Sequence, residues 1–263
     1  MSNNHPIGIF DSGLGGLTIY NEIHTLLPNE DIIYLADSKN APYGEKSKEE
    51  IIHLCVKNTE FLLQKDCKLI VVACNTASTN AVKYLREHYD VPFIRVQPAI
   101  KPAALNSRTK VVGILATKGT LKSELLFETS QRFARGVQVV EQVGEGLVSL
   151  IEHGKMKSPE MTALLHKYIE PMLLENIDYL VLGCTHYPFL TDQIEKITGD
   201  RVCVIDSGEA IARQTRVILE QEGLLNQDSH VVKRHFFTNK NQSVLQDMLN
   251  LFHENLLAEK SQF

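Results

Sequence analysis

The sequence predicts an α/β protein with two similar lobes, each a mostly parallel sheet flanked by helices. Short apolar runs rich in isoleucine and valine alternate with longer stretches of helical period, which is typical of strand–helix units around a parallel sheet. The strand-like segments of the first half recur in order in the second half, 105 to 111 residues later. We interpret this recurrence as a duplicated half. The alternative is that two unrelated α/β segments simply look alike.

Four strands are expected in each lobe. Those of the first lobe are residues 7–10, 31–36, 68–73 and 92–96. Those of the second lobe are residues 111–115, 137–141, 179–182 and 202–205. Helices fill the gaps between them. In the helix expected at residues 47–64, an apolar stripe is formed by Ile51, Ile52, Cys55, Thr59 and Leu62.

The segment after residue 205 has no counterpart in the repeat. It is expected to form a helix from 207 or 208 to about 223, a strand at 231–237 and a helix at 242–258. We expect this tail to cross back and pack on the first lobe. The first lobe then comprises residues 1–97 and 209–263, and the second comprises residues 98–208. A cleft between the lobes is the expected place for the active site.

The composition excludes several classes of protein. With 263 residues and 43% hydrophobic content, the chain has enough apolar material for a core and is not natively disordered. Its net charge of −5 supplies no cationic surface for nucleic acid or for an anionic membrane. No secretion signal and no run of about 18 apolar residues is present, so we expect a cytoplasmic protein.

Five cysteines stand at positions 55, 67, 74, 184 and 203. No Cys-x-x-Cys pair occurs, so neither a disulfide framework nor a structural zinc site is expected. Cys74 and Cys184 each follow an apolar strand at equivalent points of the repeat, where backbone dipoles favour the thiolate. We therefore predict that this pair is reactive, and we assign Cys55, Cys67 and Cys203 to packing.

Two thiols on opposite sides of a bound molecule suit one reaction class. A base removes a proton from one face of a carbon and an acid returns a proton to the other face, and the roles swap in the reverse direction. Asp11 near Cys74, and His186 two residues after Cys184, are candidates to tune the thiols. Asp11 also opens a glycine-rich turn whose N–H groups can hold an anion at a helix start.

Other interpretations of these residues remain open. The turn departs from the Gly-x-Gly-x-x-Gly pattern of a dinucleotide site, which speaks against a nucleotide ligand. Asp11 could serve only to cap the following helix, and His186 could be an ordinary turn residue.

Four motifs together resemble the glutamate racemases of the aspartate/glutamate racemase superfamily. They are Phe-Asp-Ser-Gly-Leu-Gly-Gly at 10–16, Ala-Pro-Tyr-Gly at 41–44, Ala-Cys-Asn-Thr-Ala at 73–77 and Gly-Cys-Thr-His-Tyr-Pro at 183–188. The match spans nearly the whole chain in order and spacing. This resemblance implies cofactor-independent racemisation of L- and D-glutamate, supplying D-glutamate for peptidoglycan, without a metal ion.

By position, the resemblance also implies roles for single residues. Cys74 would act on the α-proton of D-glutamate and Cys184 on that of L-glutamate, and the residues assisting proton transfer would be Asp11, His186 and Glu152. The implied substrate contacts are Asp11, Ser12, Tyr43, Gly44, Asn75, Thr76, Thr185 and His186, with Thr117 and Thr120 in the same pocket. Hydroxyl, amide and backbone N–H donors suit the carboxylates of glutamate, so few basic side chains are needed.

Other roles also fit some of these residues. Tyr43 also fits a packing role, and Glu152 also fits an ordinary helix end. A metal-dependent hydrolase would use Cys74, Cys184, His186 and Asp11 as ligands, although the sequence holds no local ligand cluster.

Further alternatives concern the substrate and the assembly. An amino-acid-binding module of two lobes would need an export signal. The substrate could be aspartate or another amino acid instead of glutamate, because the spacing of residues in the sequence does not distinguish side chains that differ by one methylene. We expect a homodimer. Because only six residues precede the first strand, we expect no activation by a cell-wall precursor of the kind tied to N-terminal extensions in some glutamate racemases.

Overall fold

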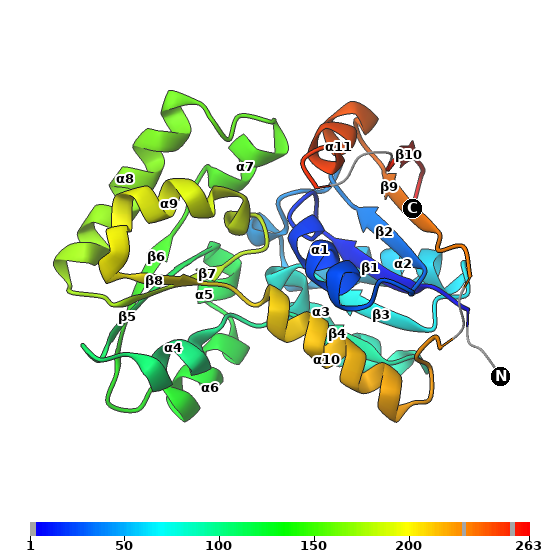
Figure 1. The fold of residues 1–263 in the computed structure, drawn as a ribbon, viewed down its shortest axis with the longest axis horizontal. Coiled ribbons are helices and arrows are strands. Elements are labelled where there is room, and N and C mark those ends of the chain that lie inside the picture. The colour runs from blue at the N-terminus through cyan, green and yellow to red at the C-terminus, as the bar shows by residue number, and fades with distance from the viewer. Residues whose placement is uncertain (1–3, 228–229, 253–255) are drawn as a thin grey trace. The chain divides into compact units, whose positions relative to one another are not determined.

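The computed structural model describes residues 4–227, 230–252 and 256–263. The chain divides into two compact units (Figure 1). Unit 1 comprises Met1–Val96 and Gly208–Phe263, and unit 2 comprises Gln97–Ser207. Each unit is built around its own sheet.

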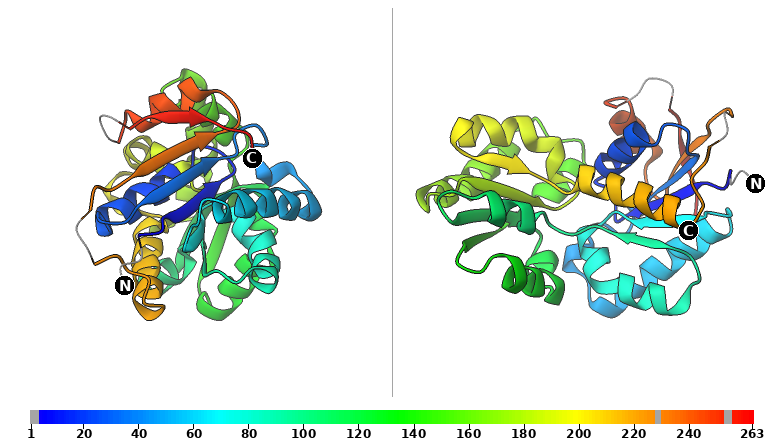
Figure 2. Two further views of the ribbon diagram at one scale, coloured as in Figure 1. Left: turned by 90° about the vertical axis from the view of Figure 1, so that its right-hand side faces the viewer. Right: turned by 60° about the horizontal axis from the view of Figure 1, so that its bottom comes forward.

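Unit 1 contains a six-stranded sheet in the order β10-β9-β2-β1-β3-β4. All of its neighbouring strands pair in parallel. The strands are β1 (Ile7–Asp11), β2 (Ile32–Ala36), β3 (Leu69–Val72), β4 (Phe93–Arg95), β9 (Arg234–Thr238) and β10 (Ala258–Lys260). Figure 2 shows β9 and β10, from the end of the chain, beside β2 from its beginning.

Helices cover both faces of this sheet (Figure 2). They are α1 (Leu17–Leu26), α2 (Lys48–Leu63), α3 (Asn75–His88), α10 (Gly208–Gln221) and α11 (Gln242–Leu249), with the short 3₁₀ helix η1 (Tyr43–Glu45) before α2. Side chains of alternate strand residues, such as Phe10 and Val72, form one core with α2 and α3. Helices α1 and α10 pack against each other on the other face.

Helix α2 shows how local sequence sets an element. Ser47 is its N-cap and accepts a hydrogen bond from the Glu50 N–H, while the Glu50 side chain accepts one from the Ser47 N–H. This capping box satisfies two amide groups that a helix start leaves without partners. The expected apolar stripe is buried at Ile51, Cys55 and Leu62, which fixes the face that meets the sheet.

Unit 2 contains a four-stranded sheet in the order β6-β5-β7-β8, again with parallel pairing throughout. The strands are β5 (Val111–Ala116), β6 (Gln138–Val143), β7 (Tyr179–Gly183) and β8 (Cys203–Ile205). Side chains of β5 alternate between two cores, with Ile114 in one and Leu115 in the other. The sheet is therefore covered by apolar side chains on both faces, as parallel sheets generally are.

The helices of unit 2 belong to these two cores. They are α4 (Ile100–Asn106), α5 (Lys118–Leu121), α6 (Glu124–Phe133), α7 (Leu147–Glu152), α8 (Pro159–Leu174) and α9 (Thr191–Thr198), with 3₁₀ helices η2 (Tyr187–Leu190) and η3 (Gly199–Arg201). Residues of α7, α8 and α9 line one core, and residues of α4 and α6 line the other. Among the residues that the structure describes, no helix is both long and apolar enough to cross a membrane.

The strand order confirms the predicted fold class of two similar α/β lobes with parallel sheets. Pairing β1 with β5, β2 with β6, β3 with β7 and β4 with β8 converts the order β2-β1-β3-β4 into the order β6-β5-β7-β8. All eight strands expected in the repeat are present, and no strand end differs from its expected position by more than two residues. Cys74 follows β3 and Cys184 follows β7, so the two thiols occupy equivalent positions in the two sheets.

Two expectations about the tail and the thiols are wrong. The last helix ends at Leu249 instead of residue 258, and Ala258 begins β10; residues 253–255 of the expected helix lie outside the described chain. The Gln246 side chain accepts a hydrogen bond from the Ala258 N–H at 2.9 Å, and β10 pairs with β9, so tertiary pairing replaces a helical ending. Cys203 is exposed rather than packed, because it begins the edge strand β8.

Candidate active site

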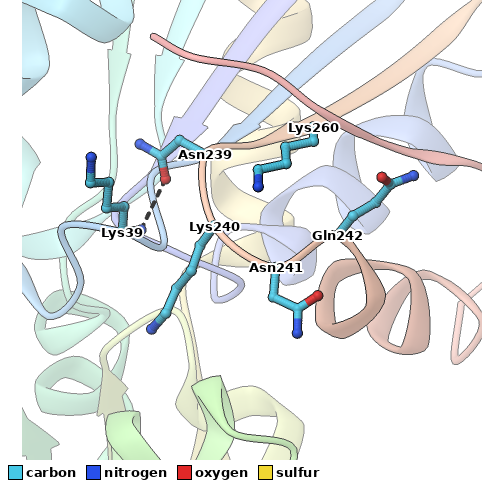
Figure 3. Close-up of a pocket in the computed structure, with 6 residues that line it drawn as sticks. All are labelled: Lys39, Asn239, Lys240, Asn241, Gln242 and Lys260. Atoms are coloured by element: carbon cyan, nitrogen blue, oxygen red, sulfur yellow. Dashed lines mark hydrogen bonds between the residues drawn. The ribbon is translucent and has the colours of Figure 1, made fainter.

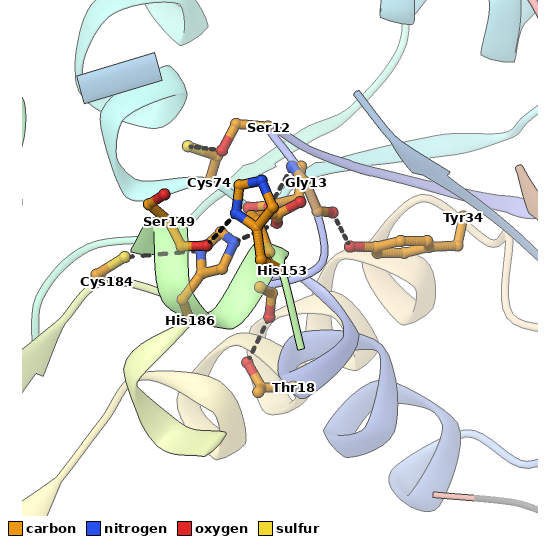
Figure 4. A network of polar contacts seen from close by, with 12 residues as sticks. Ser12, Gly13, Thr18, Tyr34, Cys74, Ser149, His153, Cys184 and His186 are labelled. Carbon is orange, nitrogen blue, oxygen red and sulfur yellow. Dashed lines mark hydrogen bonds and ion pairs between the residues drawn. The ribbon is translucent and has the colours of Figure 1, made fainter. Parts of the chain in front are cut away.

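Cys74 is held at the start of helix α3. Its sulfur accepts a hydrogen bond from the Ala77 N–H at 3.5 Å, which makes Cys74 the N-cap of the helix. The same sulfur donates to the Ser12 Oγ at 3.6 Å (Figure 4). A thiol at a helix N-terminus gains from the helix dipole when it loses its proton. The strand-to-helix junction therefore places the Cys74 sulfur at the N-terminal end of the α3 dipole, within hydrogen-bond distance of the Ala77 N–H.

Asp11, the last residue of β1, shapes the glycine-rich turn. Its fully buried carboxylate accepts a hydrogen bond from the Gly13 N–H at 2.8 Å. The Tyr34 hydroxyl donates to the Gly13 carbonyl at 2.8 Å (Figure 4). A β-carbon on Gly16 would lie 2.6 Å from the Asp11 β-carbon, so only glycine allows this close approach. Gly16, not Asp11, occupies the N-cap position of α1.

The second thiol, Cys184, is the first of a chain of three polar side chains. Cys184 Sγ lies 3.8 Å from His186 Nδ1 (Figure 4). His186 Nε2 lies 2.6 Å from Glu152 Oε1. All three residues are buried. Cys184 and His186 follow β7, whereas Glu152 is the last residue of α7. Glu152 therefore orients the imidazole, and the imidazole faces the thiol, as a carboxylate, base and nucleophile do in other activated sites.

The charge on His186 is set by these partners. Burial by itself lowers the pKa of His186, but the hydrogen bonds to Cys184 and Glu152 outweigh burial and raise the pKa well above 6.5. At neutral pH the ring is therefore an imidazolium between Glu152 and Cys184. An imidazolium beside a thiol can stabilise a thiolate or help to return a proton to it.

The pH dependence of the free energy of unfolding should report the protonation of His186. Between pH 6.5 and the raised pKa, the folded protein holds a proton on His186 that the unfolded chain has lost. The free energy of unfolding should therefore fall as pH rises, by up to about 1.4 kcal/mol per pH unit from this group. Urea unfolding of the parent and of His186→Gln between pH 6 and 9 measures this dependence. The parent's excess in free energy of unfolding over the variant should shrink as pH rises. An advantage that stays constant over this range would contradict the assignment.

The Tyr43 hydroxyl is hydrogen-bonded to two side chains of unit 1. The hydroxyl donates to Asp37 Oδ2 at 2.5 Å and accepts from Asn58 Nδ2 at 3.2 Å, and the side chain is 1% exposed. Burial is the largest cause that raises the pKa of Tyr43 well above 10.0, and electrostatic interaction with Cys74 adds to it. The ring therefore packs as a neutral phenol near the Cys74 thiol. Gly44 lies in the same short 3₁₀ helix, η1.

Asp37 was missed by the sequence reasoning. It directly follows β2, just as Asp11 ends the neighbouring strand β1, and an acid at the carboxyl end of a strand was the signal that could have found it. Its carboxylate is 1% exposed. Burial raises the pKa of Asp37, and hydrogen bonds from Tyr43, Asn239 and Asn40 oppose that rise.

The remaining predicted contacts also follow strands of the two sheets. Asn75 and Thr76 open α3, and both are buried. Asn75 Oδ1 has no hydrogen-bond partner within the described residues, so it leaves a buried acceptor for a ligand. In unit 2, Thr117 caps α5 by accepting from the Thr120 N–H at 3.2 Å. Thr185, between Cys184 and His186, is buried.

Each unit therefore carries its own set of predicted residues, in the turns and at the helix ends that follow its strands. In unit 1 these are Asp11, Ser12, Tyr43, Gly44, Cys74, Asn75 and Thr76. In unit 2 these are Thr117, Thr120, Glu152, Cys184, Thr185 and His186. No group of three or more His, Cys, Asp or Glu side chains is arranged to hold a metal ion in residues 4–227, 230–252 and 256–263.

Known proteins are similar to this chain in sequence. The model of the Asp/Glu/Hydantoin racemase family matches residues 7–215. A glutamate racemase of Herpetosiphon aurantiacus is 48% identical over 223 residues, which cover 85% of this chain and 88% of the relative.

Solved structures agree. A glutamate racemase from Bacillus anthracis has a TM-score of 0.89 and 30% identity, covering 99% of this chain and 98% of that chain. The Escherichia coli glutamate racemase, in complex with L-glutamate and the activator UDP-MurNAc-ala, has a TM-score of 0.84 and 34% identity, covering 97% and 98%. The chain therefore belongs to the Asp/Glu/Hydantoin racemase family and, within it, to the glutamate racemases.

Proposed function

We propose that the protein interconverts L- and D-glutamate by moving protons at Cα with two cysteines, without a cofactor. The observation that carries this proposal is the equivalent placement of Cys74 after β3 and Cys184 after β7, each with its own polar partners. The names of the relatives, and the L-glutamate in the Escherichia coli structure, support glutamate as the substrate. In the proposed reaction, each thiol acts on one face of Cα.

The reaction balances with protein groups alone. A thiolate takes the α-proton and becomes a thiol, leaving a carbanion at Cα, and the opposite thiol then gives its proton to the other face and becomes a thiolate. We assign the D-isomer to Cys74 and the L-isomer to Cys184. His186 is held by Glu152 and lies beside the Cys184 sulfur, so it can balance the negative charge that forms there during proton transfer.

The substrate would be held mainly by uncharged donors. Hydroxyl groups of Ser12, Thr76, Thr117, Thr120 and Thr185 can donate to the carboxylates of glutamate. The N–H groups that open η1, at Tyr43 and Gly44, offer a further anion contact, because the Tyr43 hydroxyl is already used. Asp11 and the open acceptor Asn75 Oδ1 suit the ammonium group.

We further propose that the enzyme works in the cytoplasm, supplies D-glutamate for peptidoglycan and forms a homodimer. The family relationship supports the first two statements, and the frequency of twofold assemblies among metabolic enzymes supports the third. Sedimentation of the purified protein tests the dimer, and a monomer at micromolar concentration would overturn it.

Incubation of L-glutamate with the protein in deuterated water tests the reaction. We expect D-glutamate to accumulate toward an equal mixture, with deuterium at Cα, as measured by chiral chromatography and mass spectrometry. Activity should survive a metal chelator and be lost on thiol alkylation. Loss of activity to chelator would favour the metal-dependent hydrolase, and absence of deuterium would overturn the two-base proposal. Faster exchange with aspartate would overturn only the choice of substrate.

A further inference from the structure

Asn239 lies next to Asp37 because of the sheet register. Strands β2 and β9 pair in parallel with Ala36 opposite Thr238, so the next residue of each strand comes to the same place at the carboxyl edge. Asn239 Nδ2 donates to Asp37 Oδ1 at 2.5 Å. The Asn239 Oδ1 accepts from the Lys39 N–H at 2.9 Å (Figure 3). A backbone N–H can only donate, so both ends of this amide are fixed by their partners.

The Asp37 carboxylate joins three parts of unit 1. It accepts from Asn40 at 2.7 Å in its own loop, from the Tyr43 hydroxyl at 2.5 Å in η1, and from Asn239 in the tail. A buried carboxylate needs such donors, because burial without them is costly. Its oxygens are thereby committed to the protein, which suits a role in holding the loop rather than in contacting substrate.

We propose that Asn239 is a positioning residue for the substrate-binding loop at Tyr43 and Gly44, acting through Asp37. The tail thus contributes to the active site although it has no counterpart in the repeat. Asn239 also lies outside residues 7–215, which the family model matches. This inference rests on the proposed function in one respect, namely that the loop binds glutamate.

The consequence of losing Asn239 follows from the contacts. Without this donor, Asp37 keeps the hydrogen bonds from Asn40 and Tyr43, and its affinity for a proton rises. A protonated Asp37 is a weaker acceptor for the Tyr43 hydroxyl, so η1 is held less firmly. The loop touches the substrate in both proton transfers, so binding should suffer more than the chemical step.

Asn239→Ala tests the proposal, and Asn241→Ala is its matched control. Asn241 lies two residues later in the same connection and caps α11 by accepting from the Ser243 N–H at 3.1 Å. Asn239→Ala should raise the KM for glutamate about tenfold, as loss of a hydrogen bond to a charged group does. It should change kcat by less than about threefold and shift the acidic limb of the kcat/KM profile to higher pH. Asn241→Ala should leave KM and this limb unchanged.

The Tyr43→Phe variant tests whether Asn239 affects KM through Asp37 and the Tyr43 hydroxyl. Tyr43→Phe removes the hydroxyl that Asp37 holds, so Asn239→Ala should add little to the KM of this variant. An equal rise of KM in Asn241→Ala, or full additivity with Tyr43→Phe, would overturn the proposal in favour of a general loosening of the tail.

The ring signal of Tyr43 gives a readout without catalysis. In protein labelled with ¹³C at the tyrosine ζ-carbon, with the signal assigned by its loss in Tyr43→Phe, Asn239→Ala should shift the Tyr43 signal and Asn241→Ala should not. An unshifted signal in Asn239→Ala would overturn the positioning role. If the parent fails to racemise glutamate, the proposed function fails while this spectrum still decides the positioning role.

Discussion

Replacing Cys184 by alanine is expected to lower kcat for glutamate racemisation by about 10³-fold or more, and replacing Cys74 should do the same. Each proton transfer needs an acid or base on its own face of Cα, and alanine supplies neither. Because every turnover uses both faces, either loss stops the reaction in both directions. Chiral chromatography of L- and D-glutamate over time measures the effect.

Cys203→Ala is the matched control for these variants. Cys203 is exposed at the start of β8, in the same unit as Cys184, and makes no contribution to the proposed site. We expect it to retain the parent rate. A Cys74→Ala or Cys184→Ala protein that is folded by circular dichroism and still racemises at the parent rate would show that the two-cysteine mechanism is wrong.

The second large effect is expected at His186. Replacing it by asparagine removes the imidazolium that faces Cys184, and we expect kcat/KM to fall by about 10² to 10⁴-fold. The fall must be equal in both directions, because the two enantiomers have equal free energy. The asymmetry of the site therefore has to be sought in isotope effects.

Glutamate deuterated at Cα makes that asymmetry visible. When the step at Cys184 is slowed, breaking the Cα–deuterium bond of L-glutamate limits the rate, so its isotope effect on kcat/KM should rise. With deuterated D-glutamate, the bond is broken at Cys74 before the slow step, so the isotope effect should fall. Glu152→Gln should act in the same sense but more weakly, because it changes the partner of His186 and leaves the ring in place. Unchanged isotope effects in His186→Asn would contradict a role for His186 at Cys184.

The thiol positions could be predicted because the information for them is local. The run Leu69–Val72 is apolar and β-branched, so it forms a buried strand, and the next polar residues start a helix. Tyr179–Gly183 before Cys184 is also apolar and mostly buried, and the 3₁₀ helix η2 follows it. A parallel sheet places the ends of such strands at one edge, so the repeat in the sequence was enough to select Cys74 and Cys184 from five cysteines.

The hydrogen-bond partners of the site residues were harder to predict from the sequence. Glu152 looked like a helix end, and the structure shows that it is a helix end whose carboxylate also meets His186, 34 residues later. Tyr43 could be named from the resemblance, but the use of its hydroxyl by Asp37 and Asn58 depends on how α2 packs beside η1. Hydrogen bonds between side chains on different elements leave no periodic trace in a sequence.

By itself, then, the sequence determined the two parallel sheets, their duplication and the strand ends that carry Cys74 and Cys184, because hydrophobic period and strand-to-helix junctions are properties of neighbouring residues. Only the tertiary structure decided that the tail adds β9 and β10 to the first sheet, that Cys203 is exposed, and that Asn239 meets Asp37 across 202 residues. The physical reason is that strand register and edge position depend on which distant segments pair, and that choice is made by the packing of the whole sheet.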